Sequence, residues 1–367
     1  MDQTLSDRVI EIACAIQQIP APTFVETERA AFVQQRLADE GLSQVSRDTL
    51  GNVFARLPGT SKAPPLVITA HLDTVFPSST DLTLNRLPDK IVGPGIGDNS
   101  LGVAALFGLA WSLSDLPRDI WLVANVCEEG LGNLRGIKAV VDRFGRDVLA
   151  YIVVEGMSLG QVYHVGLGVQ RYRITVHTTG GHAWVDYGKP SAINELAELA
   201  VKLSHLPLPE QPRTTLNIGV IQGGTSINTI AAEASLELDL RSEDPQILAN
   251  LAVQVESLAK ASQRDSQDPV RITAEVIGQR PAGQIPVDHP LVSLAVRSLQ
   301  EQGLTARLNT GSTDANCPLS YGLPAICVGV TTGGGAHTTD EFIYTRPVEQ
   351  GLQQLIRLTK QACGQLA

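Results

Sequence analysis

Four continuous apolar runs, rich in β-branched residues, constrain the fold of this 367-residue chain most strongly. They cover residues 65–70, 120–126, 150–154 and 324–330, and polar or glycine residues follow each of them. Runs of this kind are typical of strands that are buried on both faces of a parallel sheet. We therefore predict an α/β fold with a mixed, mainly parallel sheet.

Acidic and imidazole side chains stand where three of these strands should end. His71 and Asp73 follow the first run, Glu128 and Glu129 the second, and Glu155 the third. Open α/β sheets bind their ligands at the carboxyl ends of the strands. The pattern His-x-Asp alone is as compatible with a solvated strand end as with a metal site.

Two glycine-rich loops supply an aspartate and a histidine. Asp98 follows the glycines of residues 93–97 and precedes a helical pattern, so by itself it is better explained as a helix cap. His337 follows three glycines at 333–335. Strand ends and loops that supply His, Asp, Glu, Glu and His in turn nevertheless predict a metal site.

Spacing does not decide between the adjacent Glu128 and Glu129. Neighbouring side chains on an extended backbone face opposite ways, so a turn would have to redirect one of them before both could serve one site. Two neighbouring carboxylates also repel each other, and a bound cation relieves that repulsion.

The pattern in the middle of the chain predicts a separate domain. Strand patterns at 171–177, 215–221, 234–240 and 270–276 alternate with helical patterns at about 192–206 and 245–261. The order strand, helix, strand, strand, helix, strand is ferredoxin-like. We expect a catalytic domain in two pieces, 1–165 and 279–367, with an inserted domain at 166–278.

These motifs resemble those of the zinc exopeptidase and deacylase family that includes glutamate carboxypeptidase, succinyl-diaminopimelate desuccinylase, aminoacylase and peptidase T. They occur in the same order as in that family, and the resemblance covers nearly the whole chain. The resemblance implies two zinc ions, for which cobalt or manganese could substitute, and an inserted domain that acts as a lid and dimerisation domain. It assigns Asp98, Glu129 and His337 to one ion, and His71, Asp98 and Glu155 to the other. It also implies that Asp73 supports His71 and that Glu128 is the general base.

The resemblance extends to the inserted segment. His182, after a glycine pair, matches a lid histidine that reaches the substrate carbonyl, and without the family match it would be a turn residue. Trp184 replaces a small residue of the family pattern, so it either narrows the pocket or packs at a subunit interface. Substrate-binding positions of the family fall on Arg280, Arg241 and Asn228, which would otherwise be solvated surface residues.

The predicted function is cleavage of an amide bond. Glutamate at position 155 favours, within the resemblance, the carboxypeptidase and aminoacylase branch, so our first hypothesis is an exopeptidase acting on short peptides or acyl amino acids. The second is an N-acyl-amino-acid deacylase or desuccinylase. The third is a member that binds metal or ligand without catalysis, although such a protein has no need for a base at Glu128.

Composition narrows the partners and the compartment. The net charge of −10 disfavours a nucleic-acid partner, and no apolar stretch approaches the ~20 residues that span a bilayer. The first residues show no secretion signal, and five scattered cysteines suit a reducing cytoplasm. We expect a cytoplasmic enzyme that forms a homodimer through the inserted domain.

Overall fold

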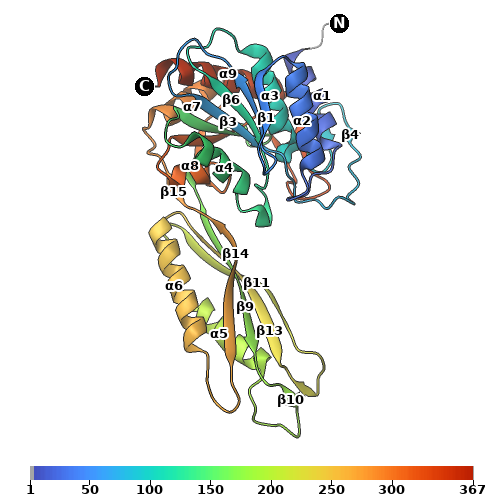
Figure 1. The fold of residues 1–367 in the computed structure, drawn as a ribbon, viewed down its shortest axis with the longest axis vertical. Helices are drawn as coiled ribbons and strands as arrows, with labels where there is room; N and C mark the ends of the chain where they lie inside the picture. The colour runs from blue at the N-terminus through green and yellow to red at the C-terminus, as the bar shows by residue number, and fades with distance from the viewer. Residues whose placement is uncertain (1–3, 367) are drawn as a thin grey trace. The chain divides into compact units, whose positions relative to one another are not determined.

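The computed structural model describes residues 4–366, which form two compact units (Figure 1). Unit 1 comprises the chain up to Gly166 together with the chain from Gly283 onward. Unit 2 is the continuous segment Leu167–Ala282. Each unit has its own hydrophobic core.

The large sheet of unit 1 has the order β1-β2-β6-β3-β7-β17-β8-β15, and β16 also pairs with β8. In that order the strands are β1 (Ser43–Arg47), β2 (Val53–Leu57), β6 (Ile120–Asn125), β3 (Leu66–His71), β7 (Ala150–Glu155), β17 (Ala325–Gly329), β8 (Gln161–Gly166), β15 (Gly283–Gln284) and β16 (Arg307–Gly311). The central strands β6, β3, β7 and β17 are parallel, whereas β2 and β8 run antiparallel to them. This confirms the predicted mixed sheet with a mainly parallel centre.

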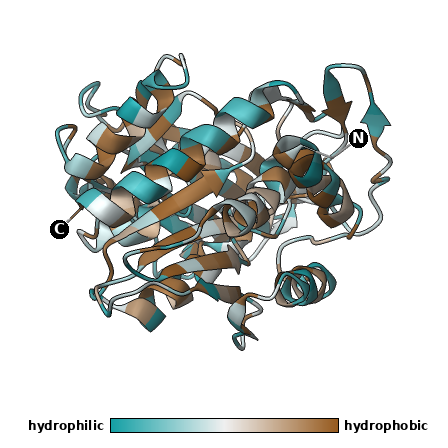
Figure 2. Ribbon diagram, turned by 90° about the horizontal axis from the view of Figure 1, so that it is seen from above, coloured by the Kyte–Doolittle hydropathy of each residue, from teal (hydrophilic) through white to brown (hydrophobic). Residues whose placement is uncertain are grey.

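Helices cover both faces of this sheet, which is why every residue of β3 is buried. On one face α3 packs with α1 and α9, and on the other α4 packs with α8. Figure 2 shows the hydrophobic strands between helices whose outer faces are hydrophilic. The helices of unit 1 are α1 (Leu5–Gln17), α2 (Thr27–Asp39), α3 (Leu101–Ser112), α4 (Arg135–Phe144), α7 (Pro290–Gln300), α8 (Asn316–Ser320) and α9 (Pro347–Gln365), with short helical turns at Ile96–Ser100 and Gly130–Gly132.

A second, small sheet joins two distant loops of unit 1. Its order is β18-β19-β5-β4, formed by β18 (Gly333–Gly334), β19 (Phe342–Tyr344), β5 (Lys90–Val92) and β4 (Asn85–Arg86). Phe342 pairs with Val92, so the segment after β18 lies beside the glycine-rich loop that follows β5.

Unit 2 is a four-stranded antiparallel sheet with two helices. Its main elements are β9 (Gly168–His177), α5 (Ala192–Ser204), β11 (Thr214–Gly223), β13 (Glu233–Ser242), α6 (Pro245–Ala261) and β14 (Arg271–Arg280), and the sheet order is β11-β13-β9-β14. Buried residues alternate along β9 and β13, because one face packs on α5 and α6. Element order and strand order are those of the ferredoxin-like fold predicted for this segment.

Two further short strands, β10 (Gly181–His182) and β12 (Thr229–Ile230), pair with each other outside the main sheet of unit 2. Among the helices of residues 4–366, none has both the length and the apolar character needed to cross a bilayer.

Candidate metal centre

Six of the predicted residues converge in unit 1, although they come from five separate segments. His71 and Glu155 close β3 and β7, the glutamate pair follows β6, Asp98 precedes α3, and His337 lies in the loop after β18. Three groups of possible ligands, each with its atoms within 4.8 Å of one another, are formed by His71, Asp98 and Glu155; by His71, Glu128 and Glu129; and by Asp98, Glu129 and His337. Parallel strands bring their carboxyl ends to one edge of the sheet, which explains the convergence.

Asp98 stands between the two histidines. Its Oδ1 lies 3.1 Å from His71 Nε2, and its Oδ2 lies 3.1 Å from His337 Nε2. Glu155 Oε2 is 3.6 Å from His71 Nε2, and Glu129 Oε1 is 3.1 Å from His337 Nε2. The site therefore has two halves, each with one histidine and one glutamate, that share one aspartate.

The ring of His71 is oriented by its own strand end. Its Nδ1 lies 3.0 Å from the main-chain oxygen of Asp73, to which it donates its proton. Its Nε2 is then directed at Asp98 and Glu155. A histidine that donates one ring N–H to a carbonyl while its other nitrogen faces carboxylates has the arrangement that metal-binding histidines use.

The carboxylate of Asp73 fixes the turn that carries the two glutamates. Its Oδ1 accepts a hydrogen bond from the Glu128 amide and its Oδ2 one from the Glu129 amide, both at 2.9 Å. Thr23 Oγ1 also donates to Oδ2 at 2.9 Å. Cys127 has φ of 57°, so the chain turns sharply there and the two glutamates do not follow an extended backbone. Both glutamates consequently face His71.

Negative charge dominates the centre. The carboxylates of Asp98 and Glu129 raise the pKa of His337 to about 10. Burial acts to raise the pKa of Asp98, but the rings of His337 and His71 hold it below its ordinary value. Burial raises the pKa of Glu155, and the carboxylates of Asp98 and Glu129 add to this rise, although His71 acts to lower it. Imidazole and carboxylate ligands arranged in this way fit a pair of divalent cations.

Two buried groups that sequence reasoning did not assign hold the loop of Asp98. The Glu341 carboxylate accepts hydrogen bonds from its backbone, and Asn99 is anchored to the end of β7. Burial raises the pKa of Glu341 to about 7. Nothing in the sequence distinguishes Glu341 from its neighbour Asp340, because neither lies in a periodic pattern.

Asp314 is fully buried in unit 1. Asn125 Nδ2 donates to its Oδ2 at 2.7 Å, and Asn125 pairs in register with His71 across β6 and β3. Burial raises the pKa of Asp314 to about 7.

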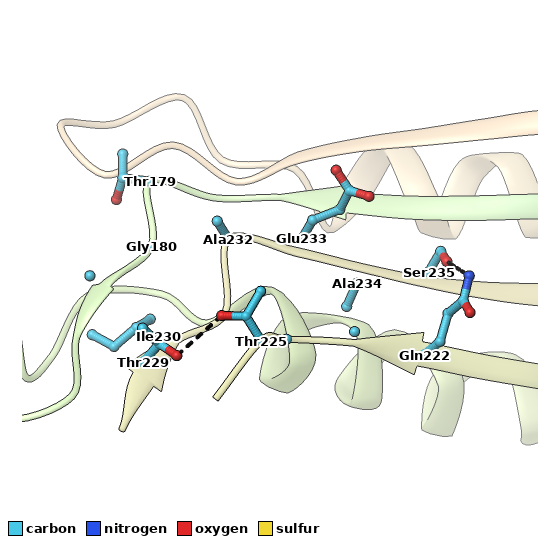
Figure 3. A pocket seen from close by; sticks show the side chains of 13 residues that line it. Thr179, Gly180, Gln222, Thr225, Thr229, Ile230, Ala232, Glu233, Ala234 and Ser235 are labelled. Atoms are coloured by element: carbon cyan, nitrogen blue, oxygen red, sulfur yellow. Dashed lines mark hydrogen bonds between the residues drawn. The ribbon is translucent and has the colours of Figure 1, made fainter. Parts of the chain in front are cut away.

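In unit 2, the structure brings His182 and Asn228 together. His182 pairs with Thr229 across β10 and β12, and the Ala183 amide donates to the Asn228 main-chain oxygen at 3.0 Å. A pocket of about 600 Å³ adjoins these short strands and is lined mainly by glycine, alanine, serine and threonine (Figure 3). The backbone of His182 is fixed by Asp186, whose Oδ2 accepts from its amide at 2.8 Å.

The hydrogen bonds of His182 define its tautomer. The amides of Trp184 and Val185 both donate to Nδ1, at 3.2 and 3.4 Å. The proton of the neutral ring is therefore on Nε2, which makes Nε2 a hydrogen-bond donor.

The two arginines lie at the other end of unit 2. Arg241 and Arg280 flank Val169, one on each side of β9. Asp239 accepts from Arg241 Nε at 2.7 Å and from Arg171 Nε at 2.8 Å. Arg280 is buried near the end of β14. The stretch of β9 from Val169 to His177, which leads to His182, spans ~27 Å at about 3.4 Å per residue.

Residues 67–361 match the peptidase family M20/M25/M40. The chain belongs to this family. It is a hydrolase, as its sequence predicts.

Two relatives and one solved structure align with nearly all of the chain. An uncharacterized protein of Bacillus subtilis, YqjE, is 24% identical over 95% of both chains. A putative succinyl-diaminopimelate desuccinylase of Mycobacterium tuberculosis is 24% identical over 91% of this chain and 93% of its own. The crystal structure of a tripeptidase from Staphylococcus aureus matches with a TM-score of 0.83 at 22% identity, over 99% of this chain and 100% of that one.

Proposed function

We propose that this chain is a dinuclear zinc exopeptidase that removes a terminal residue from short peptides or acyl amino acids. The observation that carries the proposal is the position of Asp98, whose two carboxylate oxygens each face a different histidine and glutamate pair. Two halves that share one carboxylate are suited to two ions a few ångströms apart. Histidine and carboxylate ligands suit zinc, for which cobalt or manganese could substitute.

Glu128 is assigned the role of general base. When bound, the two cations would lower the pKa of a water molecule and polarise the amide carbonyl. Glu128 forms a possible ligand group with His71 and Glu129. The two ligand groups that share Asp98, however, each have three ligands without Glu128. Glu128 is therefore available to take the proton of the attacking water and to return it to the leaving nitrogen. Asp73 holds Glu128 in place through the Glu128 amide.

His182 is assigned to the oxyanion. Its Nε2–H donor is exposed on a short turn that is fixed by Asp186, so it is available to a developing negative charge on the substrate carbonyl. Asn228, which lies beside it, would bind the same part of the substrate. Arg280 is assigned to the substrate carboxylate, and Arg241, already paired with Asp239, would support it.

The geometry of unit 2 favours action across two subunits. His182 and Arg280 belong to the same unit but lie beyond opposite ends of the stretch of β9 from Val169 to His177, which is ~27 Å long. A dipeptide spans only about 7 Å. A short substrate that contacts both residues must therefore receive them from two copies of the chain.

The exposed edge of unit 2 supports a homodimer through the inserted domain. Within the described residues β11 pairs only with β13, and Val220 and Ile221 are exposed along its free edge. Helix α5 packs beside β11 and exposes Ile193 and Val201. A long, apolar, unpaired edge strand is a template for pairing with a second chain.

A cytoplasmic location is part of the same proposal. All five cysteines are buried and unpaired by disulfides, which suits a reducing compartment.

N-deacylation is the second candidate, because a relative that aligns with most of this chain is described as a putative desuccinylase. Both candidates use the same centre and differ in the acyl group that they accept.

Steady-state turnover on a panel of substrates decides between the exopeptidase and the deacylase. Dipeptides, tripeptides, N-acetyl and N-succinyl amino acids should be assayed with zinc, cobalt and manganese, at equal concentrations of protein. The exopeptidase proposal requires the highest kcat/KM on peptides, whereas preference for N-acyl amino acids would favour the deacylase. No turnover by a protein that binds two metal ions would leave only the non-catalytic alternative.

A further inference from the structure

The buried side chain of Glu341 holds one side of the loop that carries Asp98. Glu341 Oε1 accepts hydrogen bonds from the amides of Gly97 and Asp98 at 2.7 and 2.8 Å, and Oε2 accepts one from Gly95 at 3.2 Å. Its main-chain oxygen accepts a fourth from Gly93 at 2.8 Å. One residue thus receives four amides from one short loop, three of them at a fully buried carboxylate.

The backbone of this loop departs from helical geometry at two residues. Asp98 and Asn99 have φ/ψ of −116°/85° and −135°/36°, which are not helical angles. Successive amides that converge on a carboxylate form an anion-binding concavity, and here the anion belongs to the protein itself. The carboxylate therefore supplies acceptors for amides at the start of a helical turn, where no intrahelical acceptor is available.

Asn99 anchors the opposite side of the loop. Its Nδ2 donates to the Val154 main-chain oxygen at 2.9 Å, and its Oδ1 accepts from the Gly156 amide at 2.7 Å. Asp98 is thus fixed on one side to Glu341 and on the other to the residues that flank Glu155.

The same segment also supplies a ligand. His337 precedes Glu341, and turns joining Gly335 to Thr338 and Thr338 to Glu341 connect them. The small sheet then continues through Phe342, which pairs with Val92. One short segment thus supplies both His337 and the carboxylate that binds the Asp98 loop.

We propose that Glu341 is a positioning residue that holds Asp98 between the two metal ions by binding the backbone amides of residues 95, 97 and 98. The proposal rests on the dinuclear centre proposed above, and it goes beyond it by naming the group that makes the bridging geometry possible. Groups that orient metal ligands typically contribute 10- to 100-fold to metal affinity or activity.

The test is a zinc titration of chelator-treated protein, carried out with wild type, Glu341→Gln and Glu341→Asp. Glutamine has the same shape but places an N–H donor against amides that are themselves donors. We expect zinc affinity of Glu341→Gln to fall about 10- to 100-fold for at least one of the two ions. Turnover at saturating zinc should fall through kcat with little change in KM. Glu341→Asp keeps the charge and should show a smaller loss.

Asp48→Asn is the matched control. Asp48 Oδ1 accepts the amides of Leu50, Gly51 and Asn52 at 2.9 to 3.0 Å, in a turn of unit 1 that carries none of the proposed ligands. The Asp48→Asn variant should lower the melting temperature as Glu341→Gln does, yet leave zinc affinity unchanged. Thermal unfolding of the metal-free proteins measures this structural component separately.

The outcomes distinguish this inference from the proposed function. If wild type binds no pair of zinc ions, the proposed function fails. If wild type binds two ions and Glu341→Gln binds them with the same affinity, the positioning role is wrong. Equal weakening of zinc binding by Asp48→Asn would also overturn it, because the effect would then be one of general stability.

Discussion

Glu128 and Glu129 are adjacent in sequence, yet they are assigned different chemistry. Both face His71, but only Glu129 also lies beside Asp98 and His337. Glu128→Gln should therefore lower kcat by about 10²- to 10⁴-fold, as expected for loss of a general base, with metal content near that of wild type. Glu129→Gln should instead lose affinity for one ion.

Elemental analysis after dialysis, together with kcat at saturating substrate, checks both variants. Loss of metal from Glu128→Gln with retention in Glu129→Gln would show that the two roles are exchanged.

Sequence reasoning selected candidate ligands that follow apolar strands, because strand ends can be located from hydrophobic runs. His71, Glu155 and the glutamate pair are of this kind. The residue pattern alone left the choice between Glu128 and Glu129 open, because the turn at Cys127 cannot be predicted from an extended pattern, and only the family resemblance assigned the two roles. Sequence reasoning gave no role to Glu341, because the partners of Glu341 are backbone amides of a distant loop.

At the scale of elements, the long strands and helices were predictable and the short ones were not. The order of strands and helices in unit 2 could be predicted from the alternation of apolar and polar residues along β9 and β13 and from the apolar stripes of α5 and α6. The strands β10, β12 and β18 have two residues each, which is too short to show a period. These strands position His182 and His337, so the loops nearest the proposed chemistry were the least accessible to sequence analysis.

The free edge of β11 is the element on which the proposed dimer depends. Ile221 is 59% exposed there, and replacing it with lysine places a charge where a second strand would pair. We expect Ile221→Lys to shift the protein from dimer to monomer and to lower turnover while retaining both metal ions. Light scattering coupled to size exclusion measures the change.

Val276→Lys is the matched control for Ile221→Lys. Val276 is 48% exposed and lies on β14, at the opposite edge of the same sheet. This variant should remain dimeric. Dissociation by Val276→Lys alone would place the interface at β14 instead.

For the whole molecule, the charge of the metal centre couples zinc binding to pH. The carboxylates around His337 raise its pKa to about 10, so in the metal-free protein this ring is protonated at pH 8. Zinc requires the unprotonated ring, so binding must release that proton, and zinc affinity should fall as the pH is lowered. Above about pH 10 the ring of His337 would already be neutral, so it would no longer contribute to the pH dependence of zinc affinity.

Calorimetric titration at pH 8 in two buffers of different ionisation enthalpy measures the protons released on zinc binding. His337→Gln should release fewer protons than wild type and bind one ion more weakly. Equal heats in both buffers would contradict this linkage.

Mixing two inactive variants tests whether one site draws on two copies of the chain. His182→Ala keeps Glu128 and the ligand set, whereas Glu128→Ala keeps His182. If His182 acts across the dimer, a heterodimer of the two contains one complete site, because the His182→Ala subunit supplies the metal centre and its partner supplies the histidine. After exchange of subunits, an equal mixture should recover about one quarter of wild-type activity, since about half of randomly mixed dimers are heterodimers with one of two sites intact. Action within one subunit predicts no recovery, because every site would then lack either Glu128 or His182. Adding Ile221→Lys to both variants should abolish the recovery, which ties the shared site to the β11 edge and not to a transient encounter between subunits.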